Sequence, residues 1–265
     1  MPSGVTTAVS MDVGNTKTAV GLFEGGDLLR SWRVSTRHWT PDELGLLLRA
    51  MLGDGGDEQP SLLSFATVVP QVRHSIEKAA ADYLGADVIE VCAATSGIRA
   101  SYPRPEELGP DRIANAVAAV LLGNLPAIVA DFGTATTFDV INSKGEYLGG
   151  AIAPGIGTAA SELFRKAELL NPVDLDLPGS ALGRTTAEAV RSGVLLGSAG
   201  AADRLVELLS PFAGEGAVHL ATGGWAEGIA GVCRTPFVVI PALTLMGVNE
   251  VGRRCREGIS RCPGR

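Results

Sequence analysis

The sequence predicts an α/β protein made of two duplicated domains, each with a mixed sheet. Predicted strands and helices alternate along the 265 residues, a length that suits one large domain or two modest ones. The pattern apolar-Asp-x-Gly-x-x-x-Thr occurs twice, at Met11–Thr18 and at Ala130–Thr137. Because a repeated segment indicates a repeated structural unit, we expect an N-terminal domain at residues 1–124 and a C-terminal domain at residues 125–265.

Each copy of the repeat predicts three strands joined by tight turns. Asp12 and Asp131 are 119 residues apart, and the same offset places Gly26 on Gly145. We therefore expect a strand, a turn at Asp-x-Gly, a second strand, a glycine hairpin and a third strand in each copy. The second and third strands are expected at Ala19–Phe23 and Leu28–Val34, and at Phe138–Ile141 and Tyr147–Ile152.

The remaining elements follow from apolar periodicity. Leu44, Leu47, Leu48 and Met51, for example, have the spacing of an amphipathic helix. Helices are expected at Pro41–Leu52, Val72–Leu84, Asp111–Leu122, Thr158–Leu170, Thr186–Leu209 and Ala226–Gly231. Further strands are expected at Leu62–Val69, Val88–Val91, Val218–Ala221 and Phe237–Ile240, and a surface loop at Gly53–Asp57.

Composition and charge narrow the range of partners. The chain is 46% hydrophobic and 19% charged, which indicates a compact globule rather than a disordered chain. No apolar run approaches the roughly 20 residues of a membrane span, and Met1–Gly4 does not resemble a signal peptide. The formal net charge is −7 and no basic block occurs. We expect a cytoplasmic protein without nucleic-acid or membrane partners.

The cysteines and histidines show no metal-binding pattern. Neither C-x-x-C nor H-x-x-x-H spacing is present, so we expect no structural zinc and interpret these residues as structural. They are Cys92, Cys233, Cys255 and Cys262, with His38, His74 and His219.

The two Asp-Gly turns are candidate nucleotide-binding elements. An Asp at a strand end, followed by glycine and hydroxyl residues, sets a carboxylate beside backbone N–H groups, which suits phosphates and a divalent cation. Two such turns facing one another across a cleft would clamp one nucleotide. The alternative for each copy is an ordinary β-turn, since Asp and Gly favour turns.

The sequence favours neither of two other nucleotide-binding motifs. No Gly-Lys dipeptide occurs, so the chain has no P-loop. Gly155–Ala160 fits the loose dinucleotide pattern G-x-G-x-x-A, with Asp174 and Asp176 beyond it. Pro154 precedes this pattern and the acids lie in a Pro-rich connector, so a turn that brings backbone near the cleft is the favoured interpretation.

Asp111 and Arg112 form a second candidate constellation. Asp111 follows Pro110 at the start of a predicted helix, where a helix N-cap is the structural alternative. Arg112 opposes the helix dipole and calls for an anionic partner. A carboxylate base next to an arginine that holds a substrate carboxylate would serve phosphoryl transfer.

The ordered motifs resemble the type III pantothenate kinases. They span the chain from Met11 to about Gly247, and six motifs in the family's order make the resemblance specific. The motifs are Asp12–Thr16, Ala66–Pro70, Gly109–Ala116, Asp131–Thr137, Gly149–Gly155 and Ala221–Gly224.

The resemblance implies an actin-like fold of the acetate and sugar kinase superfamily, with ATP in a cleft between its two domains. It implies phosphorylation of pantothenate to 4′-phosphopantothenate, the first step of coenzyme A biosynthesis, with Mg²⁺ and a monovalent cation, K⁺ or NH₄⁺. It also implies a homodimer, for which the alanine-rich helices after Asp111 and Thr186 offer small surface residues; the alternative is that these alanines pack inside one subunit.

The resemblance implies residue roles as well. Asp111 would be the general base, Asp12 would lie near Mg²⁺ and Asp131 would bind the monovalent cation. The ATP-binding residues would be Asp12, Val13, Gly14, Asn15, Thr16, Lys17, Thr18, Ala19, Thr134, Gly223 and Gly224. The pantothenate-binding residues would be Tyr102, Gly109, Pro110, Asp111, Arg112 and Thr186.

The chain departs from the family pattern at Lys17, where Asn or His is commoner, at Val190, where Met is usual, and at Ala242, where Asp is usual. None of these changes removes a catalytic group. Two alternatives stay open: a regulatory or accessory member of the fold that binds nucleotide without turnover, and a kinase for another hydroxylated acceptor.

Overall fold

The computed structural model describes residues 7–53 and 59–259. Cys262 and all of the expected Gly53–Asp57 loop except Gly53 lie outside this part of the chain. The described residues form two compact units. Unit 1 contains those of Met1–Ile98, Pro103–Leu122 and Leu243–Arg265, and unit 2 contains Arg99–Tyr102 and Gly123–Ala242. This division differs from the expected boundary at 124/125, because the chain returns to unit 1 at Leu243 and visits unit 2 at Arg99–Tyr102.

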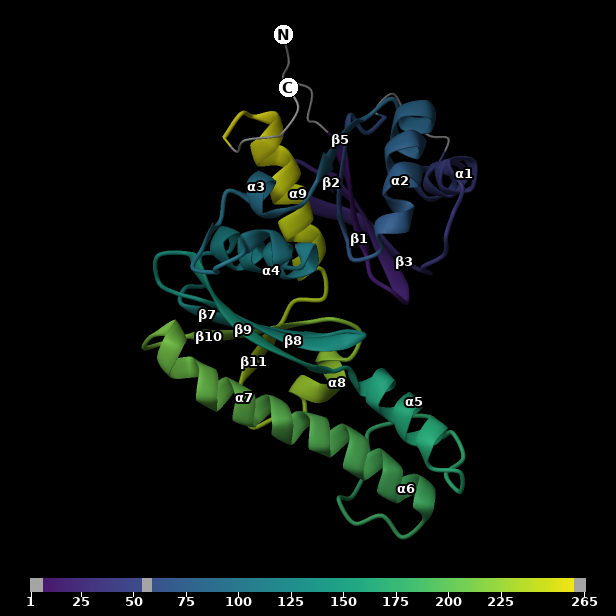
Figure 1. The fold of residues 1–265 in the computed structure, drawn as a ribbon, viewed down its shortest axis with the longest axis vertical. Helices are drawn as coiled ribbons and strands as arrows, with labels where there is room; N and C mark the ends of the chain where they lie inside the picture. The colour runs from purple at the N-terminus through teal and green to yellow at the C-terminus, as the bar shows by residue number, and fades with distance from the viewer. Residues whose placement is uncertain (1–6, 54–58, 260–265) are drawn as a thin grey trace. The chain divides into compact units, whose positions relative to one another are not determined.

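Unit 1 is a sheet covered by helices on both faces. Its strands follow the order β3-β2-β1-β4-β5, with bounds β1 Thr7–Val13, β2 Lys17–Glu24, β3 Asp27–Ser35, β4 Leu62–Thr67 and β5 Asp87–Glu90. Helices α1 (Pro41–Leu52) and α2 (Arg73–Ala79) pack apolar side chains such as Leu48 and Ile76 against β1 and β4. Helices α4 (Pro110–Leu121) and α9 (Leu243–Arg256) lie on the opposite face (Figure 1). Short elements complete the unit: η1 Pro70–Val72, η2 Ala80–Leu84, α3 Ala93–Ser96 and η3 Pro105–Glu107.

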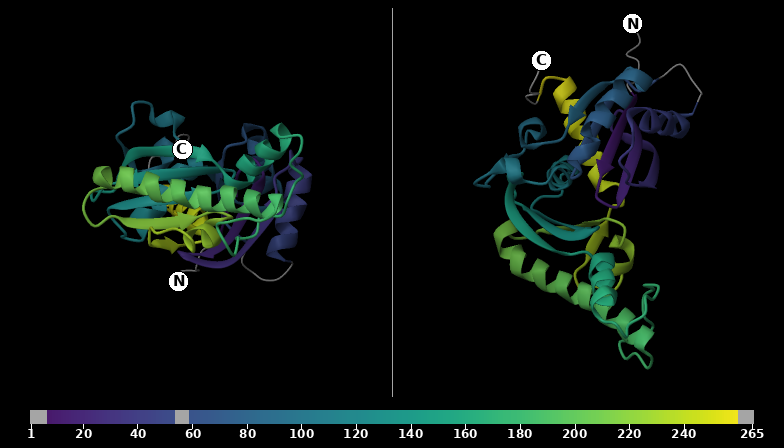
Figure 2. Two further views of the ribbon diagram at one scale, coloured as in Figure 1. Left: turned by 90° about the horizontal axis from the view of Figure 1, so that it is seen from below. Right: turned by 45° about the vertical axis from the view of Figure 1, so that its right-hand side comes forward.

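Unit 2 is built on a second mixed sheet. Its strand order is β11-β10-β7-β8-β9-β6, with bounds β6 Arg99–Ala100, β7 Ala127–Phe132, β8 Ala135–Ile141, β9 Glu146–Pro154, β10 Val218–Thr222 and β11 Phe237–Val239. The long helix α7 (Gly197–Ala213) runs along one face of this sheet (Figures 1 and 2). The apolar core contains Phe132 and Phe138 from the sheet and Val206 from α7. The other helices are α5 Ile156–Lys166, α6 Thr186–Arg191, η4 Ser192–Leu196 and α8 Ala226–Ala230.

The two sheets confirm the duplication expected from the sequence. β3-β2-β1-β4-β5 and β9-β8-β7-β10-β11 have the same order, and each has two antiparallel pairings followed by two parallel ones. The short strand β6 is an addition at the edge of the second sheet, where it runs parallel to β9.

The offset of 119 residues between the two copies does not hold for their second strands. Thr18 lies opposite Val13 in the first copy, whereas Thr136 lies opposite Phe132 in the second. The first Asp-Gly turn therefore has one residue more than the second. The next hairpin restores the offset, because Glu24 pairs with Asp27 across a shorter turn than the one that joins β8 to β9.

Helix α9 has no counterpart among the expected elements. Its sequence contains two glycines and several charged residues, which hide the apolar periodicity. Gly247 lies so close to the Ala114 backbone of α4 that a Cβ there would collide with it, and a Cβ on Gly252 would collide with the Ser64 side chain of β4. Gly247 therefore permits helix contact at backbone distance, and Gly252 permits close packing of α9 on the sheet.

Two expected helices are segmented rather than uniform. Val72–Leu84 is divided into a 3₁₀ turn, α2 and the π-helix η2, and Thr186–Leu209 is divided into α6, the π-helix η4 and α7, which continues to Ala213. Strand Leu62–Val69 ends early, at Thr67, and helix Thr158–Leu170 is shifted to Ile156–Lys166.

Candidate active site

In unit 1 the first Asp-Gly turn joins β1 to β2. Asp12 is partly buried near the end of β1, while Asn15, Thr16 and Lys17 are exposed at the tip of the turn. The Gly14 N–H donates to the Lys17 carbonyl oxygen over 3.1 Å, which closes the turn. The turn thus presents exposed backbone and a hydroxyl next to a carboxylate-bearing strand, an arrangement that suits a phosphate with its divalent cation.

Thr36 holds this turn in place. Its Oγ1 donates to the Gly14 carbonyl oxygen at 2.7 Å and lies 2.9 Å from the Thr18 Oγ1, and its N–H donates to the Thr16 carbonyl oxygen at 3.0 Å. Sequence reasoning missed Thr36, because a hydroxyl residue just after the third predicted strand gives no local sign of a contact with the first turn.

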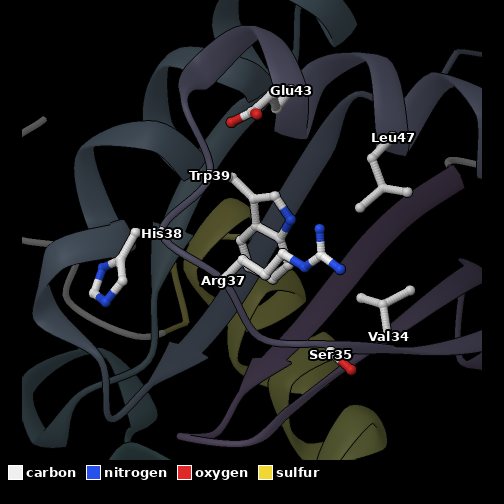
Figure 3. A pocket seen from close by; sticks show the side chains of 7 residues that line it. All are labelled: Val34, Ser35, Arg37, His38, Trp39, Glu43 and Leu47. Carbon is white, nitrogen blue, oxygen red and sulfur yellow. The ribbon is translucent and has the colours of Figure 1, made fainter.

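Lys17 has a partner on the neighbouring strand. Its Nζ donates to Ser35 Oγ over 3.1 Å, so this departure from the family pattern places a cation at the edge of the turn and not simply in solvent. Ser35 also borders a pocket of about 520 Å³ formed by β3, residues 36–40 and α1, whose lining side chains Figure 3 shows. The lining of this pocket contains none of the sequence-predicted site residues.

Asp111 and Arg112 lie together in the first turn of α4. The helix starts at Pro110 with Gly109 as its N-cap, so the alternative that Asp111 is the N-cap is wrong. Asp111 Oδ1 instead accepts the Arg112 backbone N–H at 2.8 Å. A Cβ on residue 109 would lie 2.6 Å from this oxygen, which explains the glycine.

The electrostatics of Asp111 suit proton transfer. Desolvation by burial raises the pKa of the Asp111 carboxyl, and the Arg112 N–H and the Arg112 positive charge lower it without cancelling that effect. A raised pKa makes the carboxylate a better proton acceptor than an exposed Asp at neutral pH. Arg112 itself is largely buried, with 8% of its surface exposed.

Helix α9 packs against α4, the helix that carries Asp111 and Arg112. Thr244 Oγ1 donates to Asn115 Oδ1 at 2.8 Å, and Asn115 lies one turn after Asp111 on α4 and is fully buried. The alanines of α4, including Ala116 and Ala118, are also fully buried inside the subunit. The expectation that this helix offers a dimer surface is therefore wrong, because its small residues serve internal packing.

In unit 2 the second Asp-Gly turn gathers several expected residues. The Thr134 carbonyl oxygen accepts the Gly155 N–H at 3.1 Å and the Thr158 hydroxyl at 2.7 Å. Gly223, at φ 95°, follows β10 and lies so close to Asp131 Oδ1 and the Phe132 backbone that a side chain would not fit. Asp131, Thr134 and Gly223 thus lie where β7 and β10 end, and the following Gly224 is exposed.

The dinucleotide alternative fails on topology. Gly155 is the N-cap of α5, but β9 before it runs antiparallel to β8, so this segment is not the parallel strand-helix-strand unit of that motif. The Gly155 N–H donates to the Thr134 carbonyl oxygen instead, so this segment packs on the second Asp-Gly turn.

Tyr102 and Thr186 occupy different parts of unit 2. Tyr102 follows β6 and its ring lies edge-on to Tyr147, with ring centroids 6.2 Å apart. Thr186 is exposed at the start of α6, which Figure 1 shows beyond the sheet, near α5. The preceding residue Thr185 caps this helix by accepting the Glu188 N–H.

Metal and membrane features are limited in the described residues. No group of three or more His, Cys, Asp or Glu side chains gathers there as a metal site. None of the helices in residues 7–53 and 59–259 has both the length and the apolar character of a membrane span.

Comparison with known proteins agrees with the geometry. The sequence model of the family described as type III pantothenate kinase matches residues 8–208. A type III pantothenate kinase of Anaeromyxobacter sp. (strain K) is 39% identical over 94% of this chain and 99% of its own length. One from Roseiflexus sp. (strain RS-1) is 41% identical over 92% of this chain and 97% of its own.

Solved structures with lower identity show the fold. A ROK family glucokinase from Streptomyces griseus, in complex with glucose and AMPPNP, matches with a TM-score of 0.53 at 14% identity, over 94% of this chain and 99% of that one. MreB 5 of Spiroplasma citri, bound to AMPPNP, matches with a TM-score of 0.53 at 12% identity, over 96% and 98%. The fold is the actin-like fold shared with sugar kinases, and by sequence the chain belongs to the type III pantothenate kinase family.

Proposed function

We propose that this chain transfers the γ-phosphoryl group of ATP to the primary hydroxyl of pantothenate. The products are ADP and 4′-phosphopantothenate, so the reaction is the first step of coenzyme A biosynthesis. Family similarity over nearly the whole chain supports the activity. The observation that carries the assignment of the site is the Asp111–Arg112 pair at the start of α4, with a carboxyl whose pKa is raised by burial.

Asp111 is the general base of this proposal. Its carboxylate takes the proton of the pantothenate hydroxyl as that oxygen bonds to the γ-phosphorus, and the bond from this phosphorus to the bridging oxygen of ADP breaks. The Arg112 N–H fixes one carboxylate oxygen and so restricts the rotation of the carboxylate.

Arg112 grips the pantothenate carboxylate. A guanidinium offers a bidentate pair to a planar carboxylate, and its burial strengthens the interaction by excluding water. Gly109 and Pro110 provide backbone close to the substrate, and Tyr102 and Thr186 supply further contacts.

The first turn binds the phosphates of ATP through residues Asp12 to Ala19. Magnesium keeps several water ligands and needs only one or two carboxylates beside substrate phosphates, so the single carboxylate of Asp12 fits it. When bound, this ion would neutralise phosphate charge during transfer. Lys17 adds a positive charge at the edge of the turn.

In unit 2, Asp131 binds the monovalent cation, Thr134 contacts phosphate, and Gly223 with Gly224 lies against adenine. The carboxylate of Asp131 is a hard oxygen ligand, which suits K⁺ or NH₄⁺. Turnover should therefore be higher in K⁺ or NH₄⁺ than in Na⁺ at equal ionic strength. Equal rates in all three salts would contradict the role of Asp131.

The enzyme acts as a homodimer, with Thr186 near the interface. The ground for this proposal is the resemblance to the family, which implies a homodimer. Light scattering should give twice the chain mass of 27.3 kDa, and a fully active monomer would contradict the dimer.

We place the reaction in the cytoplasm, where ATP is plentiful. The described cysteines Cys92 and Cys233 are free thiols, as is typical of a reducing compartment.

A coupled ADP-release assay tests the proposed activity. Pantothenate should support ADP formation, and a panel of sugars and amino sugars should not. ADP release with a sugar alone would favour the alternative acceptor, and nucleotide binding without any turnover would favour a regulatory member of the fold.

A further inference from the structure

We propose that Tyr147, anchored by Asp139, positions Tyr102 for its contact with the substrate. The inference rests on the proposed role of Tyr102 in binding pantothenate and adds two positioning residues that act through it. Neither belongs to the expected site.

The segment that carries Tyr102 is short and attached at few points. Arg99 and Ala100 of β6 pair with Glu146 and Tyr147 of β9, and the Ser101 N–H donates to the Tyr147 carbonyl oxygen at 2.8 Å. The residues before and after Arg99–Tyr102 belong to unit 1. The position of Tyr102 in unit 2 therefore depends on β9, where Tyr147 pairs with Ala100, accepts the Ser101 N–H and contacts the Tyr102 ring.

The two tyrosine rings make a defined contact. Their centroids are 6.2 Å apart and their planes are inclined by 67°, an edge-to-face arrangement. Tyr147 is fully buried, whereas Tyr102 is partly exposed. The buried Tyr147 ring is therefore a rigid surface that restricts the position of the Tyr102 ring.

Asp139 in turn fixes Tyr147. The Tyr147 hydroxyl donates to Asp139 Oδ1 at 2.9 Å, and both residues are fully buried. A hydrogen bond to a buried carboxylate is directional and strong, because water does not compete for either group. Phe at position 147 would keep the ring but lose this bond.

The backbone of β9 is bent where Tyr147 lies. The β8–β9 register shifts so that Ile141 pairs with Tyr147 and Val140 with Gly149, which leaves Leu148 as an extra residue. Gly149, at φ 134°, accommodates this bulge. Bulges redirect side chains, and this one lies directly after Tyr147.

Kinetics of two variants that remove the Tyr147–Asp139 hydrogen bond test the proposal. In Tyr147→Phe and Asp139→Ala the KM for pantothenate should rise about 3- to 10-fold, the range expected when one aromatic contact loses its geometry, with the KM for ATP unchanged. In a Tyr102→Ala background the same substitutions should add nothing further to this KM. The two variants are independent, so misfolding of one leaves the other as the test.

Tyr83→Phe is the matched control. The Tyr83 hydroxyl donates to Asp42 Oδ1 at 2.7 Å, so this variant also removes a Tyr–Asp hydrogen bond, but in unit 1. It should leave both KM values unchanged. An unchanged KM for pantothenate in both test variants, or their full effect on Tyr102→Ala, would overturn the proposal.

A second measurement does not depend on activity. The chain has three tyrosines, so protein labelled with 3-fluorotyrosine should give three ¹⁹F resonances. Asp139→Ala should shift those of Tyr147 and Tyr102 and leave that of Tyr83 in place. An unmoved Tyr102 resonance would refute the positioning role, whereas failure of the parent enzyme to use pantothenate would refute only the proposed function.

Discussion

Asp111→Asn separates catalysis from stability at one side chain. In the parent, Asp111 Oδ1 accepts the Arg112 N–H at 2.8 Å. The Asn amide keeps the shape of the side chain and an oxygen that accepts this N–H, but it does not take up a proton. Loss of a general base typically lowers kcat by about 10²- to 10⁴-fold, equivalent to about 3–5 kcal/mol of transition-state stabilisation. The KM for ATP should change little, because the first turn is untouched.

The same substitution should not destabilise the fold at neutral pH. Burial raises the pKa of Asp111 above that of the unfolded chain, so the folded state binds a proton more tightly. The ionised carboxylate therefore opposes folding once the pH exceeds its folded-state pKa, and a neutral amide removes this penalty. Loss of the negative charge at the α4 N-terminus reduces this gain in the free energy of unfolding by about 0.3–1 kcal/mol.

Urea unfolding and steady-state turnover measure the two effects. The free energy of unfolding of Asp111→Asn should equal or exceed that of the parent at pH 7.5. The stability of Asp111→Asn relative to the parent should fall as the pH is lowered, because protonation of the parent carboxyl removes its unfavourable buried charge. The matched control is Asp42→Asn, since Asp42 also follows a proline at the start of a helix, α1, but is exposed. Its kcat should be that of the parent. Near-normal turnover in a folded Asp111→Asn would refute the reasoning.

Three further predictions concern Arg112, the pH dependence due to Asp111, and Gly247 of α9. Arg112→Lys should raise the KM for pantothenate far more than that for ATP, because lysine lacks the bidentate fork, and equal changes would contradict the carboxylate clamp. In a pH profile, kcat/KM should fall on the acid side, because a protonated Asp111 accepts no further proton. The apparent pKa of this fall should lie above the ordinary Asp value of about 3.9, and an apparent pKa at or below about 3.9 would count against the raised pKa of Asp111. Gly247→Ala should lower the free energy of unfolding by about 1–3 kcal/mol through collision with Ala114, as measured in urea. Gly200→Ala, in open space on α7, is its control and should be neutral or stabilising, and equal losses in both variants would exclude close packing as the cause.

Local patterns predicted much of the fold. The helix Pro41–Leu52 has the expected bounds, because Thr40 and Glu43 form a capping box, Pro41 opens the helix and Gly53 ends it. The repeated Asp-Gly turns predicted two similar sheets, and the strand orders confirm them. These features depend on residues that are close in sequence.

Features that depend on distant contacts were not predicted. Helix α9 is stabilised by the approach of Gly247 to Ala114, and single-residue patterns give no sign of it. The one-residue slip between the two turns stayed hidden because the following hairpin restores the offset. In the candidate site, Thr36 reaches the first turn from the end of β3.

Product analysis by ³¹P NMR tests the central claim most directly. Purified enzyme with ATP, Mg²⁺, K⁺ and pantothenate should give one phosphomonoester resonance, coupled to the methylene protons next to the former primary hydroxyl of pantothenate, in equal amount to the ADP formed. ADP that accumulates without this phosphomonoester, or a phosphorylated product only when a sugar replaces pantothenate, would contradict the proposed function.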